Sequence, residues 1–268
     1  MRILVCIKEI QNPEIAASVF RVDEQRKEVI ALEGLPLVTS PFDEQAIEAA
    51  LRIRDSGREC RITALTFGSQ TAKAALKRAL SMGVDDAIHV LDTGLEKADS
   101  VTVARILAEA IKRSGECDLV LAGRQAADWD AGIVGCGIAQ LLDMPVVTFA
   151  RSVRVEDSKV VVERVVDDGS ETVESAMPCV ITISNELGEP RKASLRETMR
   201  AAKKPTQVQA PEEIGVNPVE TREAGERRQV RERLFVPQKD TACDLITGAS
   251  AEELAKQVIS RLSANKLI

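Results

Sequence analysis

The segment whose residues could most clearly bind a ligand is 123–135, which has the sequence GRQAADWDAGIVG. An apolar run at 119–122 precedes it and predicts a strand, and the pattern at 133–142 predicts a helix. Such a turn leaves the free amide groups of a helix N-terminus where a phosphate can bind. Ala131 and Gly132 would let a ligand approach the backbone closely, because they carry little or no side chain. One interpretation is therefore a phosphate-containing ligand, which a bulky side chain at Gly132 would block at little cost to the helix.

Two carboxylates in the same segment, Asp128 and Asp130, bear on the rest of such a ligand. Carboxylates repel phosphate, and they suit ribose hydroxyls or an adenine amino group better. A second interpretation assigns no ligand at all: Asp130 caps the helix, and the glycines allow the helix to pack closely. The spacing of these residues does not choose between the two interpretations.

Groups that could perform catalysis are scarce in this sequence. The single histidine, His89, lies in an apolar run, and neither a Ser-His-Asp arrangement nor a pair of acid and base carboxylates stands out. No GxxxxGK[ST] loop occurs, and no GxGxxG follows the first apolar run. The six cysteines lie far apart without a CxxC pair, so a His- or Cys-based metal site is not expected. The sequence thus favours a carrier or binding protein over an enzyme.

The elements that would position these residues alternate regularly over the first 150 residues. Apolar runs predict strands, and helical spacing predicts helices between them. The strands are expected at 2–7, 62–67, 87–91, 119–122 and from 145, and the helices at 43–54, 72–80, 101–111 and 133–142. Continuous apolar strands separated by helices indicate an α/β fold, with a parallel sheet covered by helices on both faces. Ligands bind such sheets beyond the carboxyl ends of the strands, so the loops after Ile7, Phe67 and Ala122 are the expected site.

The pattern changes after residue 151. Alternating residues and a turn signal at 167–170 predict a β-hairpin over about 152–176. One more strand is expected at 178–183, then a polar loop at about 184–200 in which Ser194 caps a short helix. We assign these parts to one α/β domain, residues 1–202.

Residues 203–268 are predicted to form an extended arm that ends in a helix. The stretch at 203–247 is polar and interrupted by proline, and it lacks the periodicity needed to bury itself. The terminal helix starts at Ser250 and carries an apolar stripe, formed by Leu254, Val258, Ile259 and Leu262. Such a stripe needs a surface to dock on, either its own or a partner's, and we favour a partner.

Composition limits the function further. The net charge of −6 and the 2% of aromatic residues do not suit nucleic-acid binding. No apolar run approaches 18 residues, so we expect a soluble protein that is not membrane-embedded. Widely spaced cysteines in apolar surroundings suggest a reducing compartment, and the expected location is the cytoplasm.

The stretch 162–182 resembles the signature of electron-transfer flavoprotein beta subunits. The matching elements are Arg164, Asp167, Asp168, Gly169, Glu171, Val173 and Pro178, followed by Val180-Ile181-Thr182. Further blocks similar to the family are Val5–Lys8, Ser40–Glu44, Ala79–Asp85, Gly123–Ala126 and Glu189–Arg191, with Leu195 beyond. The resemblance covers nearly the whole chain.

This resemblance implies a flavodoxin-like, Rossmann-like fold and a heterodimer with an alpha subunit that holds most of the redox FAD. It also implies an adenine nucleotide in this subunit, AMP in simple carriers or a second FAD in electron-bifurcating members. The matching positions that would line this site are Cys6, Ser40, Phe42, Phe67, Gly68, Gly123, Arg124, Gln125, Ala126, Asp128, Asp130, Ala131, Gly132, Ile133 and Val134.

The resemblance further implies an electron carrier that is redox-active only as the heterodimer. Electrons would come from acyl-CoA dehydrogenase-type flavoenzymes and pass to a quinone-linked or other redox acceptor. The residues that match the loop that docks on the dehydrogenase are Glu189, Pro190, Arg191 and Leu195.

Two departures from the family pattern leave the choice between AMP and FAD open. The family usually has Asn where Ser40 stands, and Gln followed by Thr or Val where Ile133 and Val134 stand. Two other functions are considered beside the carrier. An ATP-using enzyme on a related fold would need a glycine-rich loop after the first strand, where this chain has Lys8–Asn12. An assembly subunit would hold only a structural nucleotide or none.

Overall fold

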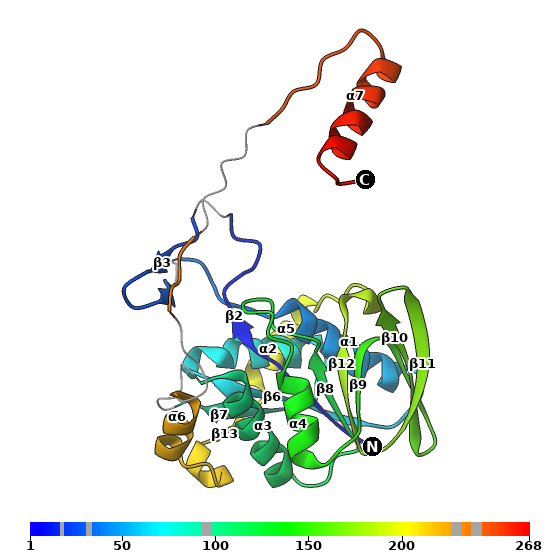
Figure 1. Cartoon of the computed structure of the whole chain (residues 1–268). Helices are drawn as coiled ribbons and strands as arrows, with labels where there is room; N and C mark the ends of the chain where they lie inside the picture. The colour runs from blue at the N-terminus through cyan, green and yellow to red at the C-terminus, as the bar shows by residue number, and fades with distance from the viewer. Residues whose placement is uncertain (17–18, 31–33, 93–97, 227–231, 237–242) are drawn as a thin grey trace.

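The computed structural model describes residues 1–16, 19–30, 34–92, 98–226, 232–236 and 243–268 (Figure 1). Its centre is a nine-stranded sheet with the order β11-β10-β9-β12-β8-β1-β6-β7-β13. The strands are β1 (Arg2–Cys6), β6 (Arg61–Gly68), β7 (Asp86–Leu91), β8 (Leu119–Gly123), β9 (Val146–Glu156), β10 (Lys159–Val166), β11 (Gly169–Ala176), β12 (Cys179–Ile183) and β13 (Gln207–Gln209). Pairing is parallel from β9 to β13, and antiparallel between β9, β10 and β11.

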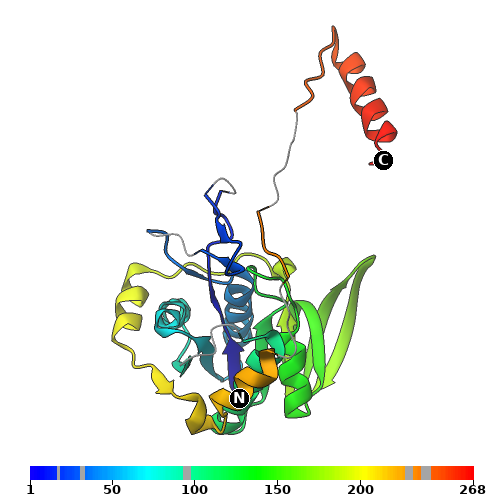
Figure 2. The same ribbon diagram turned by 60° about the vertical axis from the view of Figure 1, so that its left-hand side comes forward.

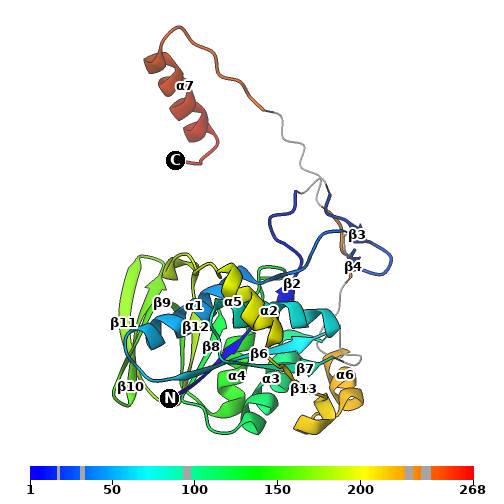
Figure 3. The ribbon, with the colours of Figure 1, turned by 180° about the vertical axis from the view of Figure 1, so that it is seen from behind.

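Helices cover both faces of this sheet. The helices of the described residues are α1 (Pro41–Asp55), α2 (Lys73–Met82), α3 (Ser100–Ser114), α4 (Val134–Leu142), α5 (Leu195–Lys203), α6 (Pro218–Glu226) and α7 (Ala251–Ala264), of which α7 covers neither face. Figure 1 shows α3 and α4 on the near face, and Figure 3 shows α1, α2 and α5 on the opposite face. The predicted α/β fold of the flavodoxin-like, Rossmann-like type is confirmed.

Several short elements lie outside the main sheet. The strands β2 (Glu9–Ile10) and β5 (Val38–Thr39) form one small sheet, and β3 (Val22–Asp23) and β4 (Glu28–Val29) form another. Single 3₁₀ turns occur at Gln70–Ala72, Asn185–Leu187 and Pro211–Ile214. Among the helices in the described part of the chain, none is both long and apolar enough to cross a membrane.

The apolar runs of the sequence are the central strands, because each of these strands is buried on both faces. In β1, Ile3 and Val5 face the core under α1 and α2, whereas Leu4 and Cys6 face the core under α3 and α4. A strand buried in this way cannot show the alternation of a half-exposed strand.

The expected hairpin is part of a three-stranded antiparallel extension, β9-β10-β11, which reaches out from the domain in Figure 2. Arg164 on β10 ties its strands together: it donates to the carbonyl oxygen of Thr148 at 3.2 Å and pairs with Glu171 at 2.8 Å. Lys159 pairs with Glu174 across the same two strands at 2.7 Å. Two members of the signature, Arg164 and Glu171, therefore hold this extension.

The segment after residue 203 differs from the expected arm. Strand β13 pairs with β7 at the edge of the main sheet, and Ile214 and Val216 are buried against the core under α3. An arm that starts at 203 therefore has its first part packed on the domain. By contrast, α7 has no buried residue and lies apart from the sheet in all three views. Ser250 caps it as predicted, while residues 227–231 and 237–242 of the expected arm lie outside the described residues.

We expect a chain cut after residue 226 to keep the stability of the domain, and a chain cut after residue 202 to lose it. The chain cut after residue 202 lacks β13 and the buried side chains of Ile214 and Val216. Each of these side chains contributes about 1.5–3 kcal/mol when fully buried. Urea unfolding of the two truncated chains measures the difference. Equal midpoints would show that residues 203–226 add nothing to the domain.

Candidate functional site

The buried carboxyl group of Asp43 joins three segments at the carboxyl edge of the sheet. Asp43 lies in the first turn of α1, and the residue is only 6% exposed. The backbone N–H of Lys8, just after β1, donates to one carboxyl oxygen at 2.8 Å. The N–H of Gly123, at the end of β8, donates to the other at 3.1 Å. This arrangement fixes the loops after β1 and β8 relative to α1.

Burial raises the pKa of Asp43 to about 7, although the N–H groups of Lys8 and Gly123 and the charge of Lys8 act in the opposite direction. A carboxyl group whose pKa is higher in the folded than in the unfolded chain binds its proton more tightly in the folded state. Its protonation therefore stabilises the fold at low pH, and this contribution is lost as the pH rises through about 7.

Gly123 lies tightly against the first turn of α1. A Cβ atom at this position would lie 2.5 Å from the carboxyl oxygen of Asp43 and 2.7 Å from Cβ of Phe42. Any larger residue would push the two elements apart. The predicted site residues Gly123 and Phe42 are thus brought together by direct packing.

Arg124, the next residue, has its guanidinium between two aromatic rings. Its Cζ atom lies 4.9 Å from the ring centre of Phe42 and 5.8 Å from that of Phe149. It also donates to the hydroxyl of Ser184 at 3.3 Å, while its buried Nε atom has no partner. Phe149 takes a φ of +58°, a conformation uncommon for a bulky residue, and lies where β9 shifts register against β12. An irregular strand thus brings the second ring to Arg124.

Both carboxylates of the loop after β8 have partners. Asp128 accepts from Nζ of Lys8 at 2.6 Å, and Asp130 accepts from the side-chain amide of Gln125 at 2.7 Å. These interactions reduce the repulsion that the two acids would exert on a phosphate. Asp130 does not cap the helix, because its φ of +50° places it in a turn ahead of the first helical residue, Val134.

The N-terminus of α4 lacks a side-chain cap. Its N-cap residue is Ile133, whose side chain offers no acceptor, so the first amide groups are left without one. Gly132 precedes the helix with a φ of +63°. A β-branched residue there would strain the backbone, so the expectation that Gly132 tolerates a bulky side chain at little cost is wrong.

Four further predicted site residues lie in the core or at the ends of β6 and α1. Cys6 and Phe67 pack in the core under α3 and α4, and burial raises the pKa of the Cys6 thiol. Ser40 is fully buried at the start of α1, and its hydroxyl has no partner. Gly68 ends β6, and its carbonyl oxygen lies 3.0 Å from Nε2 of His89, which is buried in β7. His89 is therefore a buried structural residue, as its apolar neighbours in the sequence predict.

The predicted docking residues lie on the α1 side of the sheet. Arg191 forms ion pairs with Glu48 and Asp55 of α1, both at 2.7 Å. Glu189 is exposed, Pro190 is half-buried, and Leu195 is 78% exposed at the first position of α5. Leu195 is therefore an apolar side chain that the domain does not cover.

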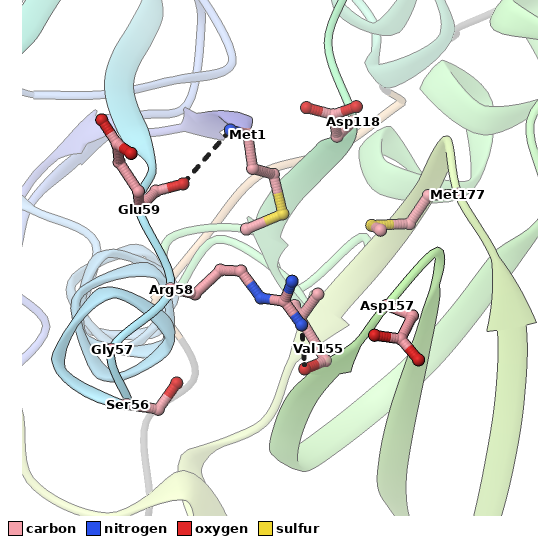
Figure 4. A pocket seen from close by; sticks show the side chains of 9 residues that line it. All are labelled: Met1, Ser56, Gly57, Arg58, Glu59, Asp118, Val155, Asp157 and Met177. Atoms are coloured by element: carbon pink, nitrogen blue, oxygen red, sulfur yellow. Dashed lines mark hydrogen bonds between the residues drawn. The ribbon is translucent and has the colours of Figure 1, made fainter.

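A hollow of about 730 Å³ lies at the opposite edge, near the amino ends of the strands (Figure 4). Its polar groups are largely engaged with the chain itself. The Met1 ammonium donates to the Glu59 carbonyl oxygen at 3.2 Å, and Asp118 accepts from the N–H of Arg2 at 2.7 Å. Ligands of such sheets bind at the other edge, so the candidate site remains at the carboxyl ends.

The fold and the loops at its carboxyl edge define an α/β protein of the flavodoxin-like, Rossmann-like class. The family described as "Electron transfer flavoprotein domain" matches residues 28–214 of the chain. The chain belongs to this family, and specifically to its beta subunits.

Curated relatives agree with this assignment. A subunit of a caffeyl-CoA reductase-Etf complex, CarD of Acetobacterium woodii, is 36% identical over 268 residues and covers 100% of both chains. The electron transfer flavoprotein subunit beta of Megasphaera elsdenii is 32% identical, again over 100% of both chains. The human subunit beta is 35% identical over 219 residues, which are 81% of this chain and 84% of the human one.

Several residues that shape the site are not among those predicted from the sequence. Asp43 and Lys8 lie inside blocks that resemble the family, but the matching positions do not mark either as part of the site. Ser184 and Phe149 give no signal in the sequence, because their role depends on the register shift in β9. The one signal in the sequence is an acidic residue, Asp43, at the third position of the helix that follows Ser40.

We expect Asp43→Asn to lower the free energy of unfolding by about 1–3 kcal/mol at pH 5, the range for a buried group left unpaired. The carboxamide has only one acceptor oxygen, so one of the two N–H groups loses its partner. Because Asn does not titrate, the difference from wild type should shrink as the pH rises through about 7. Urea unfolding of both chains between pH 5 and 8.5 measures it. A difference that grows with pH would contradict a raised pKa.

Proposed function

We propose that the chain is the beta subunit of a heterodimeric electron-transfer flavoprotein that carries electrons from an acyl-CoA dehydrogenase-type flavoenzyme to a downstream redox acceptor. The observation that carries this proposal is the uncapped N-terminus of α4 at the carboxyl edge of the sheet, in a chain that belongs to the beta-subunit family. Among the described residues no group of three or more potential metal ligands occurs. The residues of this site bind and orient, and we assign them no catalytic step.

An adenine nucleotide fits the groups at this edge. The free amides of α4 suit its phosphate, and Ala131 and Gly132 leave the approach open. Ser40 and Arg124 each hold a buried polar atom without a partner, and a nucleotide would supply one. Asp128 and Asp130 are paired with Lys8 and Gln125, which removes most of the objection that two acids raise against a phosphate.

The first choice for this ligand is AMP, with the redox FAD held mainly by the alpha subunit. A second FAD in this subunit is the second candidate, and one observation favours it. The chain is 36% identical over its whole length to CarD, whose name places CarD in a complex of an Etf with a CoA reductase. One flavin and one AMP released from the purified heterodimer would support the first candidate, and two flavins would support the second.

An ATP-using enzyme on a related fold has less support. Such an enzyme needs a phosphate loop between the first strand and a helix. Here β1 leads into the short strand β2, and the first two amides of the loop are occupied: that of Ile7 donates to the carbonyl oxygen of Leu65, and that of Lys8 donates to Asp43. The loop after β1 therefore offers no helix N-terminus to a triphosphate.

We expect Ala131→Glu to reduce the AMP that is retained by the purified heterodimer, and Ala131→Gln to leave it near the wild-type amount. The two side chains have almost the same size, but only the glutamate adds a negative charge beside the bound phosphate. A carboxylate ahead of a helix stabilises that helix by about 0.3–1 kcal/mol, so the folded chain should not suffer. Chromatography of the released nucleotide gives the ratio. Equal loss of AMP in both variants would show that the size of the side chain matters and not its charge. No loss in either variant would show that the phosphate does not bind at this position.

The helix α7 is proposed to dock on the alpha subunit. None of its residues is buried, and Val258 and Ile259 of its apolar stripe are 40% and 57% exposed. Helices with an exposed apolar stripe become stable when they pack against a partner.

We therefore expect Val258→Ser combined with Leu262→Ser to weaken association with the alpha subunit by at least about tenfold, since two apolar anchors are lost. The matched control is Glu252→Ser with Lys256→Ser, which removes only an exposed ion pair within the helix. Co-purification and titration calorimetry with the alpha subunit compare the two variants. Equal affinity in both would refute the docking role of α7.

A further inference from the structure

The helix α5 presents an apolar pair in a cationic setting. Leu195 and Met199, one turn apart, are 78% and 62% exposed. With them, Arg196, Arg200 and Lys203 line a shallow hollow of about 530 Å³. The only buried residue of this nine-residue helix is Ala201. Such a face fits a partner that offers an apolar pocket bordered by carboxylates.

A helix this short with so little buried surface does not hold its own position. Isolated helices of fewer than about 12–15 residues are marginal in water. The capping box of Ser194 and Glu197 stabilises the first turn, but it does not orient the helix on the domain. The orientation of Leu195 and Met199 must therefore come from contacts outside the helix.

The contact on the N-terminal side is an ion pair between the loop and α1. Glu48 of α1 accepts from Arg191 three times: from its backbone N–H at 3.1 Å, from Nε at 2.7 Å and from a terminal nitrogen at 3.2 Å. The Glu48 side chain is 6% exposed and that of Arg191 is 34% exposed, so solvent screens this pair only in part. Burial alone would raise the pKa of Glu48, but the hydrogen bonds from Arg191 and Arg52 outweigh it and keep the pKa below its usual range.

Other side chains of α1 hold the turn just before Arg191. Arg52 pairs with Glu48 at 2.9 Å and donates to the carbonyl oxygen of Leu187 at 2.8 Å. Gln45 donates to the carbonyl oxygen of Asn185 at 3.2 Å. One face of α1 thus fixes the segment 185–191, which leads into α5.

The contact on the C-terminal side comes from α2. Nζ of Lys77 donates to the carbonyl oxygens of Ala201 and Lys204, at 3.1 Å and 2.5 Å. A cation at this end of a helix also interacts favourably with the helix dipole. The helix is therefore held at both ends, while its docking face stays uncovered.

We propose that Glu48 is a positioning residue that, through Arg191, holds α5 in the orientation in which Leu195 and Met199 enter an acid-bordered apolar pocket of the electron donor. The inference rests on the proposed function, in which the heterodimer takes electrons from another flavoprotein, and on the prediction that Leu195 docks on this donor. Glu48 itself is buried beneath the loop and touches no partner.

The first test needs no donor. In the full chain, Glu48→Gln keeps the shape of the side chain and removes its charge. We expect hydrogen–deuterium exchange of the α5 amides, residues 195–203, to become roughly tenfold faster, and that of α3, residues 100–114, to stay as in wild type. Arg191→Lys, which keeps the charge but loses the fork geometry, should give a smaller change in the same direction. Unchanged exchange of α5 in both variants overturns the proposal.

Glu171→Gln is the matched control for Glu48→Gln. Glu171 forms an ion pair with Arg164 at 2.8 Å across β10 and β11. This variant makes the same change at a carboxylate that is paired with arginine, but it lies on the β9-β10-β11 extension and not on the loop that leads into α5. It should leave α5 exchange unchanged, and a change equal to that of Glu48→Gln would mean a general loss of stability.

The second test measures electron transfer from an acyl-CoA dehydrogenase to the heterodimer. Glu48→Gln should raise KM for the heterodimer about fivefold without changing kcat, and should add little to Leu195→Ala, because both changes act on one docking face. Flavin content should stay as in wild type. An unchanged KM in Leu195→Ala would refute the docking role on which both proposals rest. A raised KM in Leu195→Ala with wild-type values in Glu48→Gln would overturn this inference alone.

Discussion

The two hydrogen bonds to the buried carboxyl group of Asp43 are the constraint on which the rest of the site depends. They join the loops after β1 and β8 to the first turn of α1, at a point where Gly123 leaves no room for a side chain. Phe42 and Arg124 are the neighbours of these two residues in the chain, so their stacking follows from the same junction. A change at Asp43 would therefore reach groups that it does not touch.

The parts of the fold that the sequence predicts well are those in which burial is continuous. The central strands and α1 to α4 follow directly from apolar runs and helical spacing, because both faces of the sheet are covered. Strand β13 escapes this reasoning because it has only three residues, and two of them are exposed. Ile214 and Val216 are likewise too few to produce a periodic signal, although the core under α3 buries both.

The candidate site could be located from the sequence, but its contacts could not. The strand-to-helix turn at 123–135 and the family resemblance point to the carboxyl edge of the sheet, where the structure brings these residues together. The pairing of Lys8 with Asp128 spans 120 positions, and nothing local marks it. The interpretation of Asp130 as a helix cap, one of the two that the spacing leaves open, is wrong because the backbone of this residue lies in a left-handed turn ahead of the helix.

The two borders of the sheet limit how this chain can associate with others. At one border, β11 carries Glu171 and Glu174, which are held by Arg164 and Lys159 across the hairpin. At the other, β13 is three residues long and lies between Pro205 and Pro211. Charged side chains and short, proline-flanked strands both discourage the addition of a foreign strand. Partners must therefore recognise side chains on helices and loops, and growth of the sheet from one molecule into the next is disfavoured.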